Sequence, residues 1–398
     1  MHILILNRYS DAFADYARYV DHRAHTVSYV TVSGHVPMIP AHSRGHVEVV
    51  DSLTGTETVL RAAGRCHRAA GAFDAVLAMS EFDLLTAAAV REAFAAPGPD
   101  IHSTLRFRDK AVMKEAVAKA GLRVPRFEPV RSLADVAAFA RTCPGPVVVK
   151  PRTGAASAGV TVLPAGAEPA PGLLGPPAEE YEAEEFCAGP IWHIDGLRYR
   201  GETTCRFASR YIGTCHGFAQ GEPLGSVLHR DGTAERLADF SDDCLDALGL
   251  TDGPFHLEAV QHEEGPVFLE VGARVGGGEI PFVLQEVYGL DLFREWVRVL
   301  LGARPAGPVA AAAATEHVGF LMLPEPVGHT LVSRTGLVGR IPHLYAEELP
   351  DPGHRFDGKG GYEHILGRFR YRAASAESVE RAIEDTLTAY HYELTGTR

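Results

Sequence analysis

The sequence predicts a mixed α/β (α+β) protein that is built from more than one domain. The chain has 398 residues, which is longer than an ordinary single domain. Short apolar runs alternate with segments of helical periodicity near the N-terminus, and paired β-rich runs follow later. Hydrophobic residues make up 46% and charged residues 22%, which is the balance of a globular protein.

The charge and the cysteine pattern exclude several classes of protein. A net charge of −13 opposes the neutralisation of many phosphates, so no nucleic-acid partner is expected. No apolar run is long enough to cross a bilayer, so we expect no membrane partner and a cytoplasmic location. The six cysteines are scattered without a CxxC pair, which indicates free thiols rather than a zinc site or a disulfide framework.

The N-terminal quarter has the pattern of a small doubly wound, Rossmann-like sheet. Its first turn, in MHILILNRYSDAFADY, contains no glycine and no GxGxxG motif, which disfavours dinucleotide binding. The β-rich runs are 2–6, 26–32, 46–50 and 75–79, and the helical patterns are 56–70 and 80–98.

The remainder alternates between helical and β-rich segments. Glycine or proline marks several of the ends, and Pro/Gly/Ala-rich stretches at 164–177 and 302–314 indicate an exposed connector and a boundary. The expected helices are 109–121, 132–142, 234–249, a pair within 280–301 and 376–392, and the expected β-runs are 143–164 around a loop, 181–186, 192–211 and a hairpin over 254–274.

Two glutamates stand out because each lies inside an apolar, β-rich run. Glu258 in PFHLEAVQH and Glu270 in PVFLEVGAR occupy the two arms of the expected hairpin. A buried unpaired carboxylate is costly, and a bound Mg²⁺ would relieve the repulsion between two facing carboxylates. The alternative is that both face solvent or pair with an arginine such as Arg274. Spacing alone does not separate these interpretations.

Lys150 closes the apolar run PVVVK and precedes a loop that contains Gly154, Ser157 and Gly159. Such a lysine can meet phosphate oxygens, while glycines allow backbone N–H groups to approach an anion closely. The plainer alternative is a lysine that ends a strand before a surface loop.

Arg274 follows Glu270 by four residues and precedes three glycines, Gly276 to Gly278. An arginine beside a metal site can clamp a carboxylate or stabilise a transferring phosphoryl group. Pairing with the nearby glutamates is the alternative.

Taken in order, these motifs resemble the ATP-grasp superfamily, and in particular its carboxylate–amine ligases that act on L-amino acids. DKAVMKEAVAKAGLRVP is similar to the first helix of that family, VVVKPRTGAASAGV to its phosphate loop and YEAEEFCAGPIWHIDG to its adenine hinge. FHLEAV and FLEVGARVGGGEI resemble its metal-bearing strands. In the C-terminal region, VGFLMLPEPVGH and GGYEHILGRFRYRAASAESVERAIE resemble L-amino-acid ligases.

The resemblance implies an ATP-grasp fold, preceded by a Rossmann-like (pre-ATP-grasp) domain and followed by an α+β segment. The implied divisions are an N-terminal domain at 1–104, a lid at 105–187, a core with the metal site at 188–308 and a C-terminal segment at 309–398.

The resemblance also implies roles for individual residues. Glu258 and Glu270 would bind Mg²⁺, with Mn²⁺ as an alternative ion, and Arg274, Glu270 and Lys150 would serve catalysis. A lone histidine in a strand is more often a core residue, so His193 keeps that alternative. The implied contacts to ATP are Lys110, Lys150, Ser157, Gly159, Glu184, Glu185, Phe186, His193 and Asp195.

Two positions depart from the family pattern. Gly272 stands where many members have a metal-binding asparagine, and Ile191 stands where a ribose-binding glutamate is common. Both departures leave a ligand contact without an assigned residue.

The implied reaction activates a carboxylate as an acyl phosphate and joins it to an amine, with release of ADP and phosphate. The expected partners are a small-molecule carboxylate and an amine, and a homodimer is left open. An ATP-grasp carboxylase or small-molecule kinase is the first alternative. A non-catalytic nucleotide-binding regulatory protein is the second, which the intact Lys150, Glu258, Glu270 and Arg274 oppose.

Overall fold

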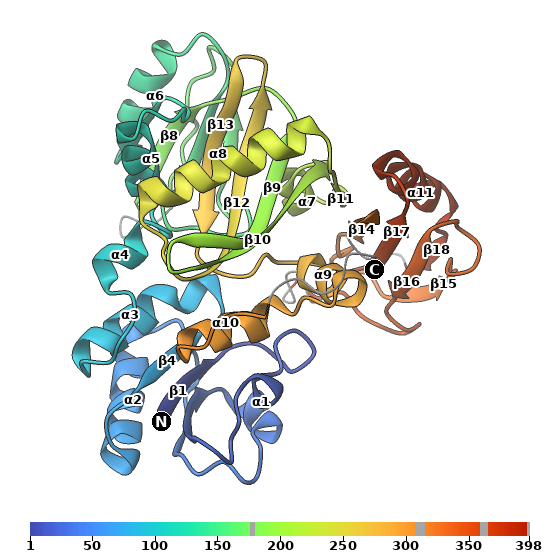
Figure 1. Cartoon of the computed structure of the whole chain (residues 1–398). Helices are drawn as coiled ribbons and strands as arrows, with labels where there is room; N and C mark the ends of the chain where they lie inside the picture. The colour runs from blue at the N-terminus through green and yellow to red at the C-terminus, as the bar shows by residue number, and fades with distance from the viewer. Residues whose placement is uncertain (176–179, 307–314, 359–364, 396–398) are drawn as a thin grey trace.

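The computed structural model describes residues 1–175, 180–306, 315–358 and 365–395, and Figure 1 shows their arrangement. Within these residues, no helix is long and apolar enough to span a membrane. The expected stretch at 302–314, the connector at 164–177 and the GGYEHI motif lie partly outside the described residues.

The N-terminal unit is a four-stranded parallel sheet in the order β3-β2-β1-β4. All six residues of β1 are buried, as expected for a central strand that is covered on both faces. The strands are β1 (His2–Asn7), β2 (Thr26–Thr31), β3 (Val47–Val49) and β4 (Ala75–Ala78). The helices are α1 (Tyr16–Tyr19), η1 (Ser33–Met38), α2 (Thr56–Ala70), η2 (Glu81–Asp83), α3 (Leu84–Ala93) and α4 (Ile101–Leu105).

A second, antiparallel sheet has the order β5-β8-β6-β7 and lies at the far end of the molecule from the N-terminal unit (Figure 1). Its own small core contains Val136, Phe139 and Val149. The elements of this unit, called the lid below, are α5 (Lys110–Lys119), β5 (Phe127–Val130), α6 (Leu133–Arg141), β6 (Val147–Pro151), β7 (Thr161–Leu163) and β8 (Tyr181–Glu185).

The central sheet has eight strands in the order β13-β12-β9-β10-β11-β14-β17-β16, and all its pairings are antiparallel. Strands from the C-terminal region therefore continue the same sheet that carries the two glutamates. The strands are β9 (Ile191–Tyr199), β10 (Glu202–Ile212), β11 (Leu224–Leu228), β12 (Gly253–His262), β13 (Gly265–Gly272), β14 (His317–Leu323), β16 (Leu344–Glu348) and β17 (Gly367–Ala373). The helices around it are α7 (Cys215–Ala219), α8 (Gly232–Leu248), α9 (Ile280–Tyr288), α10 (Leu292–Leu300) and α11 (Ala376–Ala389).

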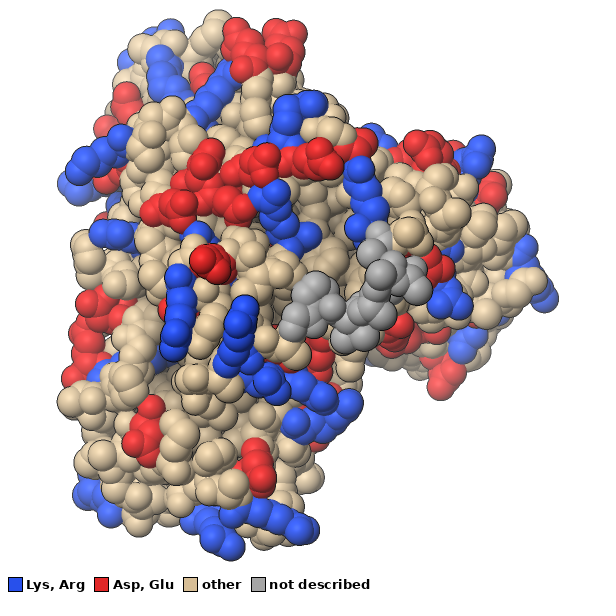
Figure 2. Space-filling view, in the orientation of Figure 1, with Lys and Arg blue, Asp and Glu red and all other residues tan. Residues whose placement is uncertain are grey.

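Helix α8 covers one face of this sheet and is strongly amphipathic. Its apolar residues, such as Leu237 and Leu245, pack on the sheet, and its acidic residues form a band on the molecular surface (Figure 2). Arg206 pairs with Asp239 at 2.6 Å in this band. The band is the solvated side of a core-facing helix.

The C-terminal helix is shorter than the sequence predicts. It ends at Ala389 rather than Tyr392, and Tyr392 begins β18 (Tyr392–Leu394), which pairs with β15 (Leu331–Arg334). The buried Tyr390 donates its hydroxyl to the Leu366 carbonyl and packs its ring edge-on against Phe369. Long-range packing thus ends the helix where the local pattern would continue it.

Candidate active site

A cavity of about 320 Å³ lies between the lid and the β12–β13 hairpin. It brings together most of the residues that were predicted to bind nucleotide or metal. The predicted residues that line it are Lys110, Lys150, Ser157, Glu184, Glu185, Phe186, Glu258 and Glu270. Gly159, His193, Asp195 and Arg274 are not among its lining residues.

Lys110 joins the lid loop to the metal-bearing hairpin. It is the first residue of α5, whose N-terminus is capped by the Asp109 side chain. Its Nζ lies 3.2 Å from Glu270 Oε2 and donates to the Gly154 carbonyl at 2.7 Å. One cation therefore holds a loop and a strand that are distant in sequence.

A buried network of lysines and glutamates forms the floor of the cavity beside β6 and β8. Lys150 Nζ lies 2.6 Å from Glu184 Oε1, and Lys114 Nζ lies 2.6 Å from Glu184 Oε2. Lys114 also pairs with Glu182, and both side chains are completely buried. Lys114 was not predicted, although it follows Lys110 by four residues and so shares its helix face.

The charges of this floor hold Glu270 in its ionised form. Burial raises the pKa of Glu270, but Lys110 and Lys150 outweigh that effect and lower the pKa to about 2. Burial lowers the pKa of Lys150, whereas Glu184 and Glu182 raise it above the ordinary lysine value. The cavity floor therefore contains fixed charges of both signs at neutral pH.

Glu258 and Glu270 lie on the two arms of the predicted hairpin and face each other across the β12–β13 ladder, because a β-bulge between Glu258 and Ala259 shifts the register. Like charges in directly opposed positions destabilise a sheet. Glu258 Oε1 accepts a hydrogen bond from the Tyr211 hydroxyl at 3.1 Å. Two carboxylates on one wall fit a hard divalent cation such as Mg²⁺.

The other end of the cavity is apolar and lies along the link between β8 and β9. Its walls include Val148, Val160, Phe186 and Ile191. The Phe186 side chain is 48% exposed, which is unusual for so large a hydrophobic residue. A flat, apolar slot beside a cationic floor fits an aromatic base that is joined to phosphates.

The loop between β6 and β7 has an unusual backbone. Ala156 and Ser157 adopt φ values of 53° and 56°, and Gly159 has φ 71°. Left-handed backbone at two consecutive non-glycine residues is strained, and such strain concentrates at ligand-binding sites. A Cβ at Gly159 would lie 2.9 Å from Pro151 Cγ, so this position also requires glycine for space.

Comparisons with known proteins agree with this geometry. No family model matches the chain. It is 24% identical over 383 residues to an L-arginine-specific L-amino acid ligase of Bacillus subtilis, covering 93% of this chain and 91% of that protein. An L-amino acid ligase structure from Bacillus licheniformis superposes with a TM-score of 0.75 at 18% identity, covering 99% and 98% of the two chains. An ADP complex of N5-carboxyaminoimidazole ribonucleotide synthetase superposes with a TM-score of 0.70 at 16% identity, covering 96% and 95%. The chain has the ATP-grasp fold.

The predicted resemblance to L-amino-acid ligases is thereby confirmed along nearly the whole length of the chain. The ATP-grasp fold accounts for the position of the cavity, which lies between the lid and the central sheet. The division of the chain into four domains stays a prediction. Strands β14, β16 and β17, which lie in the predicted C-terminal segment, belong to the sheet of the core.

Arg274 lies at the junction between the ATP-grasp core and the N-terminal unit. Its Nε lies 2.6 Å from Glu81 Oε2, and Glu81 also pairs with Arg108. Arg274 therefore pairs with a glutamate 193 positions earlier rather than with Glu258 or Glu270. Burial lowers the pKa of Arg274, and Glu81 raises it further than burial lowers it. The pairing of Glu81 with Arg274 was not predicted, because the two residues are close in the fold but far apart in the sequence.

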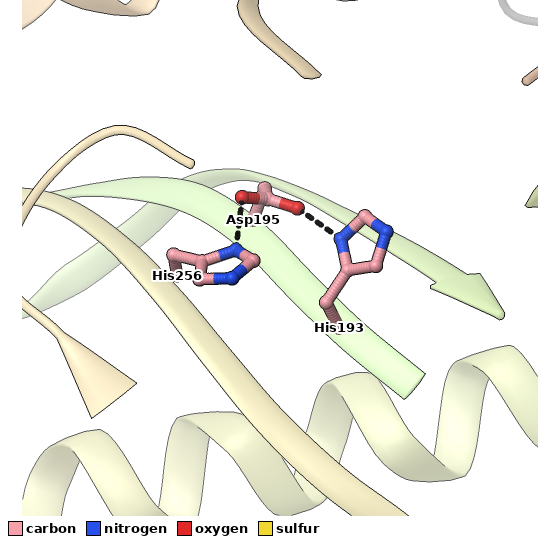
Figure 3. A group of neighbouring side chains, drawn as sticks. All are labelled: His193, Asp195 and His256. Carbon is pink, nitrogen blue, oxygen red and sulfur yellow. Dashed lines mark hydrogen bonds and ion pairs between the residues drawn. The ribbon is translucent and has the colours of Figure 1, made fainter. Parts of the chain in front are cut away.

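His193, Asp195 and His256 form a buried cluster on neighbouring strands of the central sheet (Figure 3). The two oxygens of Asp195 separately contact His193 Nδ1 at 2.5 Å and His256 Nδ1 at 2.8 Å. Burial raises the pKa of Asp195, and the two imidazoles lower it well below the ordinary aspartate value. His193 and Asp195, which were predicted to contact ATP, are not among the residues that line the cavity, and their contact to ATP stays a prediction.

The first glycine after Arg274 packs directly on this cluster, and we expect Gly276→Ala to be destabilising. The added Cβ would lie 2.3 Å from Asp195 Oδ1 and 2.8 Å from Ile280 Cδ1, so neighbouring groups must shift. Overpacking of this kind costs about 1–3 kcal/mol of folding free energy, which urea unfolding would measure.

Gly277→Ala is the matched control for that variant. An added Cβ at Gly277 meets nothing within 4 Å, and its φ lies outside the left-handed region. We expect its unfolding free energy to remain within about 0.5 kcal/mol of the parent protein. Equal stability of the two variants would contradict the packing described for Gly276.

Proposed function

We propose that this protein is an ATP-dependent ligase that forms an amide bond between a small carboxylate, an amino acid, and an amine. The observation that carries the proposal is the convergence of Lys110, Lys150, Glu258 and Glu270 on one cavity. Similarity to L-amino-acid ligases supports the amino-acid substrate, and the apolar slot beside Phe186 supports a purine nucleotide.

The residues of the cavity support the proposed nucleotide binding. Lys110 and Lys150 supply positive charge for the phosphates, and the strained loop around Ser157 can cover them. Glu258 and Glu270 would hold Mg²⁺, or Mn²⁺ in its place. When bound, the ion supplies positive charge that offsets both carboxylates and the phosphates.

In the proposed reaction, a substrate carboxylate oxygen attacks the γ-phosphorus of ATP, and the bond to the β–γ bridging oxygen breaks to release ADP. The lysines stabilise the charge that develops on the transferred group. The amine then attacks the acyl carbon, phosphate leaves and the amine loses a proton. The family resemblance supports a role for Arg274 in stabilising the acyl phosphate, although Arg274 pairs with Glu81 and does not line the cavity. The closed lid loop would exclude water from the intermediate.

A substrate screen tests the function. The protein would be incubated with Mg²⁺, ATP and pairs of amino acids, and ADP, phosphate and condensed products would be measured. A ligase releases phosphate when both substrates are present and yields a product that has lost water. A kinase would yield a phosphorylated product instead. Absence of turnover above background with every pair would contradict the ligase proposal.

Lys150→Ala should weaken ATP binding by about tenfold or more, because it removes a buried cation that faces the phosphates. Calorimetric titration with ATP would measure this change. Lys119→Ala is the control, since Lys119 lies exposed at the end of the neighbouring helix α5. Equal affinities of the two variants would remove Lys150 from the nucleotide site.

Three further features remain proposals. The net charge of −13 supports partners other than nucleic acid, and the composition supports a cytoplasmic location. A homodimer stays open to measurement by light scattering.

A further inference from the structure

His256 stands beside a predicted metal ligand on the same strand. His256 and Glu258 are two residues apart on β12, so their side chains share one face of the sheet. His256 Nε2 lies 3.6 Å from Glu258 Oε1, which is longer than a hydrogen bond between such atoms. Two ligands with metal bonds of about 2.1 Å lie roughly 3.0–3.4 Å apart, so this separation is close to that of two atoms sharing one ion.

The other ring nitrogen of His256 is already fixed. Its Nδ1 lies 2.8 Å from Asp195 Oδ1, and the second Asp195 oxygen contacts His193 Nδ1. His193 Nε2 in turn lies 2.6 Å from the Ser226 hydroxyl. A chain of this kind holds one imidazole in a single orientation, with its Nε2 directed at Glu258. Carboxylate–histidine pairs commonly support metal-binding histidines in this way.

An ion held directly among His193, Asp195 and His256 is the competing arrangement. These three residues offer ligand atoms within 4.8 Å of one another. However, each histidine Nδ1 contacts its own oxygen of Asp195 at hydrogen-bond distance, 2.5 Å and 2.8 Å. Both Nδ1 atoms of the cluster are thus paired with Asp195, and the nitrogen that faces Glu258 is His256 Nε2.

We propose that His256 is a direct ligand of the metal ion that Glu258 binds, so that the centre has mixed nitrogen and oxygen ligands and prefers Mn²⁺ to Mg²⁺. The inference rests on the proposed function, which supplies the metal–nucleotide site. Mg²⁺ strongly prefers oxygen ligands, whereas imidazole nitrogen favours first-row transition metals.

Pulsed electron paramagnetic resonance of the protein with Mn²⁺ and ADP tests this directly. Electron spin echo envelope modulation should show ¹⁴N coupling from a directly bound imidazole. The coupling should disappear in protein labelled with ¹⁵N-histidine, which separates imidazole from adenine nitrogen. It should also disappear in His256→Asn, in which the shorter side chain can still donate to Asp195. The Mn²⁺ dissociation constant should rise at least about tenfold in that variant and by a similar factor in Asp195→Asn.

His262→Asn is the matched control, because His262 lies on the same strand but contacts Arg123 at 3.1 Å, whereas His256 lies beside Glu258. It should retain the coupling and the Mn²⁺ affinity. Bound Mn²⁺ with phosphorus coupling from ADP but no histidine coupling would overturn the inference and leave the proposed function intact. Coupling that persists in His256→Asn would also overturn it. Failure of Mn²⁺ and ADP to bind would contradict the proposed function itself.

Discussion

Glu270→Gln is expected to lower turnover about 10³-fold while the protein remains folded. Glu270 is ionised, faces Glu258 across the hairpin and lies 3.2 Å from Lys110. The amide keeps the shape of the side chain but removes the negative charge that a divalent cation requires. It also leaves Lys110 and Lys150 without one of their counter-charges. ADP formation across a series of Mg²⁺ concentrations would measure the loss.

The same hairpin provides the control for this prediction. Glu264 lies at the turn, its side chain is 69% exposed and it pairs with Arg123. Glu264→Gln should leave turnover within about twofold of the parent, since exposed ion pairs contribute little. If Glu270→Gln retained more than roughly a tenth of the activity, the metal assignment would be wrong.

Lys114→Met should destabilise the fold by about 3–5 kcal/mol, the largest stability effect that we expect from a single change. Lys114 is fully buried between Glu182 and Glu184, and its ammonium also lies 5.4 Å from the Phe127 ring centroid. Methionine fills a similar volume but leaves the Glu182 carboxylate buried, with Lys150 3.9 Å away as its remaining cation. Urea unfolding would measure the change.

Two further variants separate lost charge from lost packing at this position. Lys119→Met on the exposed side of α5 should change stability by less than about 0.5 kcal/mol. Adding Glu182→Gln to Lys114→Met should recover about 1 kcal/mol or more of unfolding free energy, because it removes the buried Glu182 charge that has lost its partner Lys114. No recovery would indicate that packing, rather than the buried charge, determines the effect.

The parts of the site that were predictable are those fixed by local pattern. The hairpin was predictable from two β-rich runs that flank a short turn, whereas a β-bulge between Glu258 and Ala259 brings Glu258 opposite Glu270. Lys150 was likewise placed by its position at the end of an apolar strand. Only the family resemblance predicted that these residues line one cavity, because the spacing of residues in the sequence does not imply it.

Other parts depend on contacts that no local pattern encodes. The partner of Arg274 is Glu81, which reaches it only because the N-terminal unit docks beside the core. His256 was missed because its role depends on Asp195, which is brought opposite it by the pairing of β9 with β12. For the same reason the helix end at Ala389 was misplaced, as the packing of Tyr390 determines it.

The pairing of β11 with β14 makes the C-terminal region inseparable from the catalytic half of the chain. Removing that region would strip three strands from the central sheet and expose the unpaired backbone edge of β11. It would also remove the partner of Glu279, a fully buried residue at the start of α9 that pairs with Arg370 of β17. Chimeras between relatives would therefore have to exchange the whole sheet, since a cut between β11 and β14 divides two hydrophobic clusters to which both strands contribute.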